Sequence, residues 1–280
     1  MTARPALWTA AFLLLPLSSL PAARAEDVRD PGKILAKIDV VIKEEVERWC
    51  AQKRLSYPPS AVVLRIFKQE RELEIWAKNY GQKQLRLVRT LPICAMDFAP
   101  GPKAAEGDGK TPEGFYHPEF SYQSSNWWMW MDLGDVDARG KVGKGSSFKM
   151  CIEYPNALDR RRTRAAGFRE TGGQICMHGN CVSLGCASFK NRDFLPVFAF
   201  ARHHDAKRYG RLQLHVFPFR FDRVSVEDRT RAAKDWPHAE SFGAEKLLGF
   251  WKNLEEGFDA FNADPNPLRL RLGDEGFRFR

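Results

Sequence analysis

The chain has 280 residues, and its 44% hydrophobic and 12% aromatic content is enough to build a substantial core in one domain with additions. We find no internal repeat and no low-complexity tract, which excludes repeat and low-complexity architectures. The 44 Lys and Arg residues outnumber the 35 Asp and Glu residues, so the net charge is +9. That surplus favours an anionic partner, such as a polymer or a membrane surface.

Residues 1–25 are predicted to be a secretory signal, with Arg4 before an apolar centre at 10–15 and a cleavage motif at Ala23-Arg24-Ala25. The apolar run is far shorter than the ~20 residues of a membrane-spanning helix, which argues against an anchor. Removal of Arg4 and Arg24 leaves a net charge of +7 (9 − 2). We therefore expect an exported protein of the periplasm or cell envelope, without a stable membrane span and without a nucleic-acid partner.

The next segment is predicted to be an amphipathic helix over residues 33–50, because apolar residues recur there at three- and four-residue steps. Three β-rich runs follow, at 61–67, 73–77 and 85–88, separated by polar connections. This order predicts an antiparallel meander.

The middle of the chain is predicted to be a loop rich in Gly and Pro that leads into Thr111-Pro112-Glu113-Gly114-Phe115-Tyr116. We interpret Trp127-Trp128-Met129-Trp130 as core or the wall of a groove, with core favoured. The basic run over 160–164 is interpreted as a solvated loop rather than a binding patch.

The last third is predicted to hold a helix over 191–208 and a strand over 212–219. A C-terminal extension follows, in which residues 247–261 form a helix that Pro265 and Pro267 terminate. A terminal hairpin is expected around residues 273–276.

The segment 177–186 carries the main chemical signal, because it offers the parts that a cysteine nucleophile needs. Cys186 is the candidate nucleophile and His178 the candidate general base. Amides around Gly185 and Cys186 are candidates for an oxyanion hole. We expect His178 to lower the pKa of the Cys186 thiol and to pair with it. The competing interpretation is a buried structural cysteine.

The His178-Gly179 pair followed by Ser183-Leu184-Gly185-Cys186, together with the 111–116 string, resembles the L,D-transpeptidase (YkuD-like) family. The Tyr-Pro-Asn-Ala segment at 154–157 and the short spacing from His178 to Cys186 resemble its YafK-like branch. The resemblance implies a mostly β (α+β) fold, with a β-sandwich catalytic domain and helical additions at both ends. The expected division is 1–25 signal, 26–59 N-terminal helical segment, 60–220 catalytic domain and 221–280 C-terminal extension.

The resemblance implies a cofactor-free, metal-free enzyme that attacks peptidoglycan stems containing diaminopimelate through a thioester on Cys186. Transfer of the acyl group to an amine makes it an L,D-transpeptidase. Transfer to water makes it a hydrolase that releases a stem or a wall-linked protein. A third possibility is a non-catalytic cell-wall-binding protein. A thiol–disulfide redox protein is disfavoured, because the chain has no Cys-x-x-Cys pair.

Gly179 and Ser183 are expected to shape the site. Two roles remain open for Ser183: its hydroxyl either orients His178 or caps a turn. Gly185 is expected to adopt a backbone conformation that a Cβ would strain. Ser188 stands where the wider family has an arginine, and this departure leaves the acceptor and the reaction outcome open.

The remaining cysteines can form disulfides in an exported chain, with the pairing left open; they are Cys50, Cys94, Cys151, Cys176 and Cys181. A resting disulfide from Cys181 to Cys186 or to Cys176 would make activity redox-dependent. A zinc site of Cys176, Cys181, Cys186 and His178 is disfavoured, because the spacing resembles no common zinc module.

Overall fold

A computed structural model describes residues 31–122 and 148–279. The predicted signal at 1–25 and the Trp127–Trp130 run lie outside the described residues. The N-terminal helix α1 (Pro31–Gln52) is confirmed, as is the meander β1 (Ala61–Phe67), β2 (Glu72–Lys78) and β3 (Arg86–Pro92). The third strand runs four residues beyond the predicted 85–88 segment.

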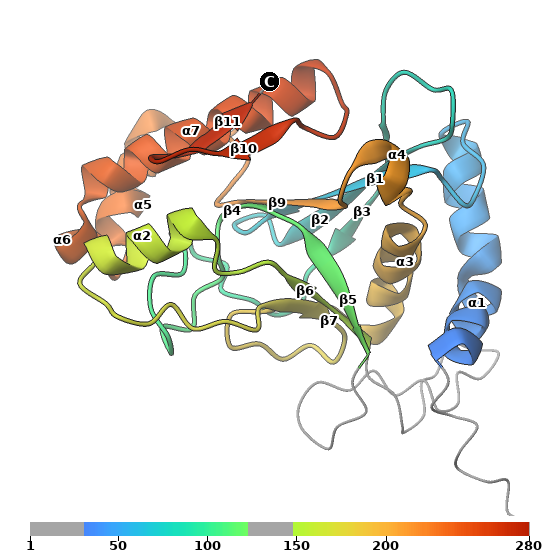
Figure 1. Ribbon diagram of the computed structural model, residues 1–280, viewed down its shortest axis with the longest axis horizontal. Coiled ribbons are helices and arrows are strands. Elements are labelled where there is room, and N and C mark those ends of the chain that lie inside the picture. The colour runs from blue at the N-terminus through green and yellow to red at the C-terminus, as the bar shows by residue number, and fades with distance from the viewer. Residues whose placement is uncertain (1–30, 123–147, 280) are drawn as a thin grey trace, which may run out of the picture.

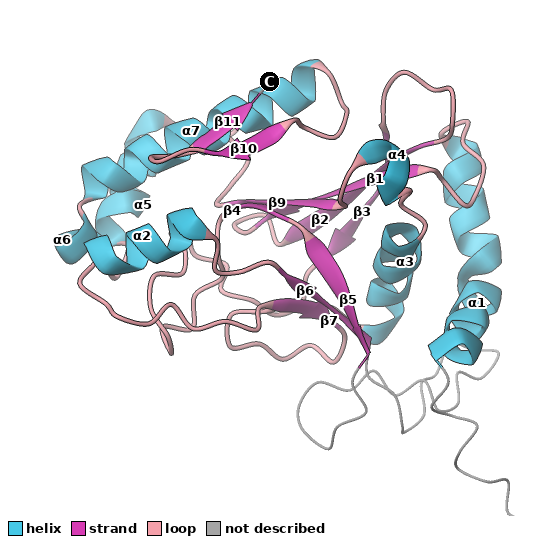
Figure 2. Ribbon diagram, viewed as in Figure 1, coloured by secondary structure: helices cyan, strands magenta, loops and turns pink. Residues whose placement is uncertain are grey.

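Two sheets form the body of the molecule, as Figures 1 and 2 show. The larger has the order β3-β2-β1-β9-β4, with β9 (Gln213–Phe217) parallel to β1 and antiparallel to β4 (Gly114–Tyr116). The smaller has the order β5-β6-β7-β8. Its strands are β5 (Pro118–Tyr122), β6 (Phe148–Ile152), β7 (Cys176–His178) and β8 (Ala187–Ser188).

Strand β1 is buried along its whole length, because both faces of the larger sheet are covered. Its side chains alternate between two cores. Leu64 and Ile66 join one cluster with Met150 and Met177 of the smaller sheet, whereas Phe67 joins another with residues of the C-terminal extension. The shared cluster makes the two sheets a sandwich.

The helices cover the ends and the outer face of this sandwich. Helices α1 and α3 (Asn191–Arg202) pack against each other on one side in Figure 1. The C-terminal extension contains α5 (Val226–Asp235), α6 (Ala239–Phe242), α7 (Ala244–Ala263) and the hairpin β10 (Leu270–Leu272) and β11 (Phe277–Phe279). The predicted C-terminal helix and hairpin are therefore confirmed. Within the described residues strands outnumber helices, although the helices are longer, and the predicted α+β class is confirmed.

Two local predictions are wrong. The basic run is not a loop but part of helix α2 (Ala157–Ala165), which begins with a capping box between Asn156 and Asp159. The side chains of this box satisfy the free amide groups of the first turn, and Arg162 is buried against Asp159. The helix predicted over 191–208 is divided into α3 and the short α4 (Ala206–Tyr209), because Asp205 caps a new helical turn.

The second motif of the sequence, 111–116, becomes a buried polar centre between β4 and the C-terminal extension. Glu113 is fully buried and pairs with Lys68 at 3.0 Å. It also accepts hydrogen bonds from the Gly101 amide at 2.7 Å and the Trp251 indole at 2.8 Å. A buried carboxylate with these three donors ties the predicted catalytic domain to α7.

Within residues 31–122 and 148–279, no helix combines the length and the apolar character needed to cross a membrane.

Candidate active site

The predicted nucleophile and base lie at neighbouring strands of the smaller sheet. His178 ends β7 and pairs with Ser188 of β8, while Cys186 directly precedes β8. Both side chains are buried, Cys186 with 7% exposure and His178 with none. The fold therefore brings together two residues that the sequence proposed as partners.

The imidazole of His178 is fixed in orientation and in tautomer. Its Nδ1 atom lies 2.5 Å from the carbonyl oxygen of Gly179. A carbonyl can only accept a hydrogen bond, so Nδ1 carries the hydrogen and Nε2 carries the lone pair. Nε2 is buried and has no hydrogen-bond partner among the described residues. The site thus holds a buried proton acceptor without a partner.

The thiol of Cys186 is held by backbone groups rather than by His178. Its Sγ accepts a hydrogen bond from the Cys176 amide at 3.4 Å and lies 3.7 Å from the Gln174 carbonyl oxygen. Cys176 begins the strand that His178 ends, so the thiol lies toward the far end of β7. The pairing of thiol and imidazole expected from the sequence is absent from the described hydrogen bonds.

Burial sets the charge state of both groups. It raises the pKa of the Cys186 thiol, against the lowering effect of the Cys176 amide and of Lys149 and Lys103. It lowers the pKa of His178, a change that Lys149 reinforces and the Gly179 carbonyl opposes. Both directions favour the uncharged forms, so the resting site holds a neutral thiol and a neutral imidazole that are not bonded to each other. The expected lowering of the thiol pKa is wrong for this state.

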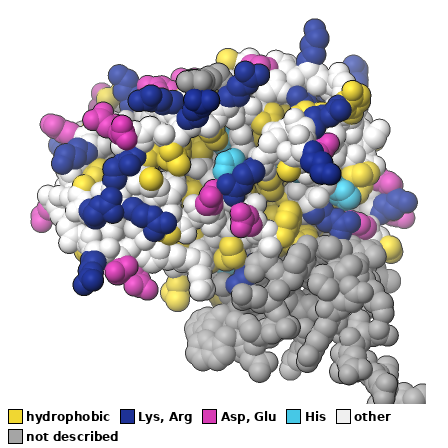
Figure 3. Space-filling view, viewed as in Figure 1, with side chains coloured by type: hydrophobic (Ala, Val, Ile, Leu, Met, Phe, Trp, Pro, Cys, Tyr) yellow, Lys and Arg dark blue, Asp and Glu magenta, His cyan; other side chains and the backbone are white. Residues whose placement is uncertain are grey.

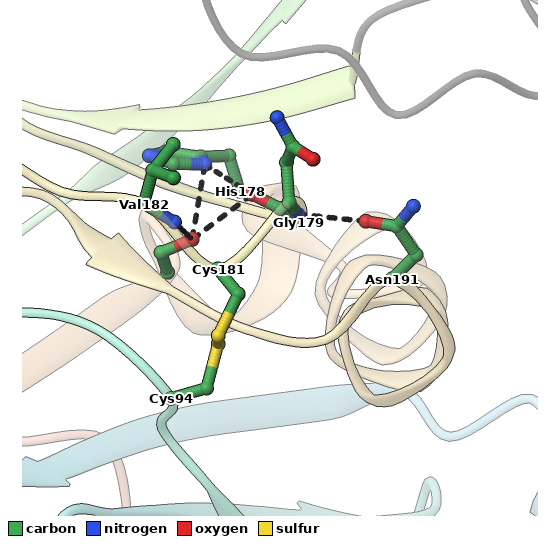
Figure 4. The surroundings of a disulfide bond; sticks show 8 residues. Cys94, His178, Gly179, Cys181, Val182 and Asn191 are labelled. Carbon is green, nitrogen blue, oxygen red and sulfur yellow. Dashed lines mark hydrogen bonds between the residues drawn. A yellow bond between two sulfur atoms is a disulfide. The ribbon is translucent and has the colours of Figure 1, made fainter.

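Ser188, rather than Ser183, makes the contacts beside the His178 ring. Its hydroxyl donates to the Gly179 carbonyl at 2.9 Å, accepts from the Val182 amide at 3.2 Å and lies 3.4 Å from Nδ1 of His178. Figure 4 draws these contacts as dashed lines that reach His178, Gly179 and Val182. The sequence carried one sign that Ser188 is unusual: a serine stands at the position where the wider family has an arginine.

Ser183 instead caps the turn before the cysteine, which settles the question left open. Its hydroxyl donates to the Cys186 carbonyl at 2.6 Å and accepts from the Gly185 amide at 3.0 Å. Gly185 has φ +114°, and a Cβ there would lie 2.7 Å from the Lys110 carbonyl oxygen. The expectation that this position requires glycine is confirmed.

A disulfide fixes the loop between β7 and β8. Cys181 is bonded to Cys94, which joins the loop to the segment after β3 (Figure 4). The same loop is held by the Asn180 amide, which donates to Asn191 at the start of α3 at 2.7 Å. Asn180 and Cys181 have φ values of 73° and 54°, left-handed conformations that such contacts stabilise.

A second disulfide joins Cys151 to Cys176, which are register partners on β6 and β7. The predicted resting disulfide from Cys181 to Cys186 or Cys176 is therefore wrong, because Cys181 and Cys176 have other partners. Cys186 and the buried Cys50 are free. Two of the four ligands of the disfavoured zinc site, Cys176 and Cys181, are in disulfides. Among the described side chains, no cluster of three or more His, Cys, Asp or Glu residues is arranged to hold a metal ion.

Two further features of the site were missed by sequence reasoning. Lys149 of β6 is the register partner of His178, and its charge affects the pKa of both candidate catalytic groups. Leu184 is 82% exposed and Val182 49% exposed, so an apolar rim lies beside the cysteine. Each residue alone is unremarkable in the sequence, because only strand pairing and loop shape bring it to the site.

A buried cysteine, a histidine with a fixed tautomer and a glycine turn are the residue types that nucleophilic catalysis by cysteine uses. The chain is a homologue of "Putative L,D-transpeptidase YafK" from Escherichia coli K12, with 27% identity over 210 residues that span 74% of this chain and 69% of the relative. The protein of the same name from E. coli O157:H7 gives the same values. This homology confirms the resemblance predicted from the motifs. No protein-family model matches the chain.

Solved structures with detectable likeness include two bacterial proteins. The helical cell shape determining protein Pgp2 from Campylobacter jejuni has 16% identity and a TM-score of 0.37, covering 78% of this chain and 74% of that chain. Bd1075 from Bdellovibrio bacteriovorus has 18% identity and a TM-score of 0.36, covering 77% and 78%.

Proposed function

We propose that the chain is an exported L,D-transpeptidase-type cysteine enzyme that acts on peptidoglycan stem peptides. The observation that supports this most is the His178 ring, whose Nδ1 is bound to Gly179 and whose buried Nε2 has no partner among the described residues. A general base needs such a free, correctly oriented nitrogen. Homology to a protein named as a putative L,D-transpeptidase supports the proposed reaction class.

In the proposed reaction, substrate binding turns the Cys186 thiol from the Cys176 amide toward Nε2 of His178. Nε2 takes the thiol proton while Sγ forms a bond to the stem carbonyl carbon. The C–N bond then breaks, and the imidazolium returns its proton to the leaving amine. A second amine attacks the thioester, its proton passes to Nε2 and from there to the departing sulfur, and Cys186 is regenerated as the neutral thiol.

The oxyanion is proposed to bind the amides of Gly185 and Cys186. The Gly185 amide now donates to the Ser183 hydroxyl, so it would exchange this partner for the developing negative charge. Gly179, Ser183 and Ser188 are proposed to shape the site through the contacts described above.

Recognition of the stem is proposed to use Lys149 and the apolar rim of Val182 and Leu184. A lysine can attract a stem carboxylate, while exposed apolar side chains can cover the peptide and exclude water. We further propose that residues 1–25 direct export, that 26–59 are an N-terminal helical segment, that 60–220 form the catalytic domain and that 221–280 are an extension.

The test is incubation of the chain from Glu26 onward with purified peptidoglycan, beside the Cys186→Ala variant, with muropeptides read by mass spectrometry. New cross-links or exchanged stems that depend on Cys186 are expected. Released stems, or release of a wall-linked protein, without new links would replace transpeptidation with hydrolysis by the same acyl-enzyme. Absence of any change dependent on Cys186 would leave a wall-binding protein.

A further inference from the structure

A second surface of the molecule, whose lining includes neither Cys186 nor His178, has the features of an anion-binding groove. Helix α2, helix α7 and the C-terminal hairpin enclose a hollow of about 900 Å³. Its floor is apolar, with Leu158, Phe250 and Phe277 buried or nearly so. A smaller hollow of about 480 Å³ adjoins it along α2. Arg161 lines both hollows, and we call the two together the α2–hairpin groove.

Five cations surround this groove without carboxylate partners. Arg160, Arg161 and Arg164 come from α2, Lys246 from α7 and Arg278 from β11. None of the five makes an ion pair with a carboxylate among the described residues. Figure 3 shows Lys and Arg side chains gathered over α2 and along the hairpin.

Two neighbouring arginines of α2, Arg162 and Arg161, differ in whether their charge is paired inside the fold. Arg162 is buried, pairs with Asp159 at 3.1 Å and lies over the Phe250 ring at 4.0 Å. Its charge is used inside the fold. Arg161 beside it donates to the Gly273 carbonyl at 2.6 Å, while its Nε is buried without a partner. Because Arg161 has no carboxylate partner among the described residues, its guanidinium charge at the junction of the two hollows is left for a ligand.

The chemistry of the rim indicates the class of ligand. Unpaired cations from three elements suit carboxylates, and the apolar floor suits short aliphatic side chains. Asp274 and Glu275 at the hairpin turn also line the groove, and neither is in an ion pair among the described residues. They add a site for an ammonium group. A peptide that carries several carboxylates and an amine fits this arrangement better than a polymer of uniform negative charge.

We propose that the α2–hairpin groove binds carboxylate-bearing peptide stems of the wall polymer at a place separate from Cys186. The identity of the polymer rests on the proposed function. Such a groove would hold the enzyme on its polymer between reactions and raise the local concentration of stems. Catalytic residues take no part in it.

The experiment measures sedimentation of the chain from Glu26 onward with purified peptidoglycan, in the Cys186→Ala background so that no turnover occurs. The variant Lys246→Glu with Arg278→Glu reverses two exposed groove charges. The matched control, Lys53→Glu with Lys83→Glu, makes the same change of net charge at exposed positions after α1 and between β2 and β3, on segments that do not line the groove. We expect about tenfold weaker binding for the groove variant and less than about twofold for the control, because charges beyond a Debye length are screened.

A second probe is peptidoglycan whose carboxyl groups have been converted to amides. The protein with the unaltered groove should bind this amidated polymer only as weakly as the groove variant binds ordinary peptidoglycan. Equal losses in both charge variants, or full binding to the amidated polymer, would overturn the proposal. Thermal melting of each variant checks that the fold is kept, and Arg278→Gln alone provides a milder second test. If the groove binds but no Cys186-dependent chemistry is found, only the catalytic proposal is rejected. If Cys186-dependent chemistry is found but the groove variant binds as well as the control, only the groove proposal is rejected.

Discussion

The Nδ1 atom of His178 lies 2.5 Å from the carbonyl oxygen of Gly179, and this contact determines which ring nitrogen can accept a proton. The Cys186 thiol is bound to the Cys176 amide instead. The structure therefore describes a resting state in which base and nucleophile are both neutral and not yet joined. Such separation protects a nucleophile from reaction before its substrate binds.

The first prediction concerns the pH dependence of thiol alkylation by iodoacetamide. Because burial raises the pKa of Cys186, we expect an alkylation midpoint above the ordinary value of about 8.5. Because burial lowers the pKa of His178, its neutral, proton-accepting form is present at pH 7. The measurement uses a Cys50→Ala chain, so that Cys186 is the single free thiol.

The matched variant is His178→Asn, whose amide can still donate to Gly179 but cannot act as a base. The alkylation midpoint should stay the same in this variant. A midpoint below pH 7 that rises on substitution would instead reveal a preformed thiolate–imidazolium pair.

The second prediction concerns Ser188→Ala. Loss of the hydroxyl leaves the Val182 amide without its partner and frees the Gly179 carbonyl for His178 alone. We expect kcat to fall about tenfold with KM nearly unchanged, since about 1.4 kcal/mol corresponds to tenfold. The acidic limb of the pH–rate profile should move upward, because the freed carbonyl stabilises the imidazolium. A change in thermal stability without any move of the pH profile would reduce Ser188 to a structural role.

The third prediction compares two glycines with positive φ. Gly185→Ala should destabilise the fold by about 2 kcal/mol or more, because left-handed strain is joined by a clash with the Lys110 carbonyl. Gly167→Ala, at φ +82° with open space around it, should cost only about 1 kcal/mol. Urea unfolding of both variants gives the comparison, and equal losses would show that the clash is relieved by small shifts.

The fourth prediction concerns the disulfide between Cys94 and Cys181. It closes a segment with a sequence separation of 87, so replacement of both cysteines by alanine should cost about 2–4 kcal/mol. Activity should fall further than stability explains, because the loop holding Val182 beside Ser188 is released. Full activity of the folded double variant would show that the loop is held sufficiently by its hydrogen bonds.

The elements with a strong local signal were predictable from the sequence. The period of the apolar residues in α1 and α7, and the β-rich runs of β1 and β2, gave elements close to those observed. Gly185 was predictable too, because a required turn conformation is a local property. Helix α2 was missed because its arginines looked like a solvated run, although Asn156 and Asp159 carried a capping signal.

The site was predictable in its motif residues and not in its charge states. Cys186 and His178 stand near one another in the sequence, so their neighbourhood in space could be expected. The raised thiol pKa depends on burial, and the roles of Lys149 and Ser188 depend on strand register. The disulfide pairing depends on which loops meet, which no spacing in the chain reveals.

The most direct measurement is the intact mass of the protein after brief mixing with stem peptides that contain diaminopimelate. The account predicts an adduct on Cys186 with the mass of an acylated stem, labile to hydroxylamine, absent from Cys186→Ala and strongly reduced in His178→Asn. An unmodified Cys186 in a folded protein that still alters peptidoglycan, or an adduct on another residue, would contradict it.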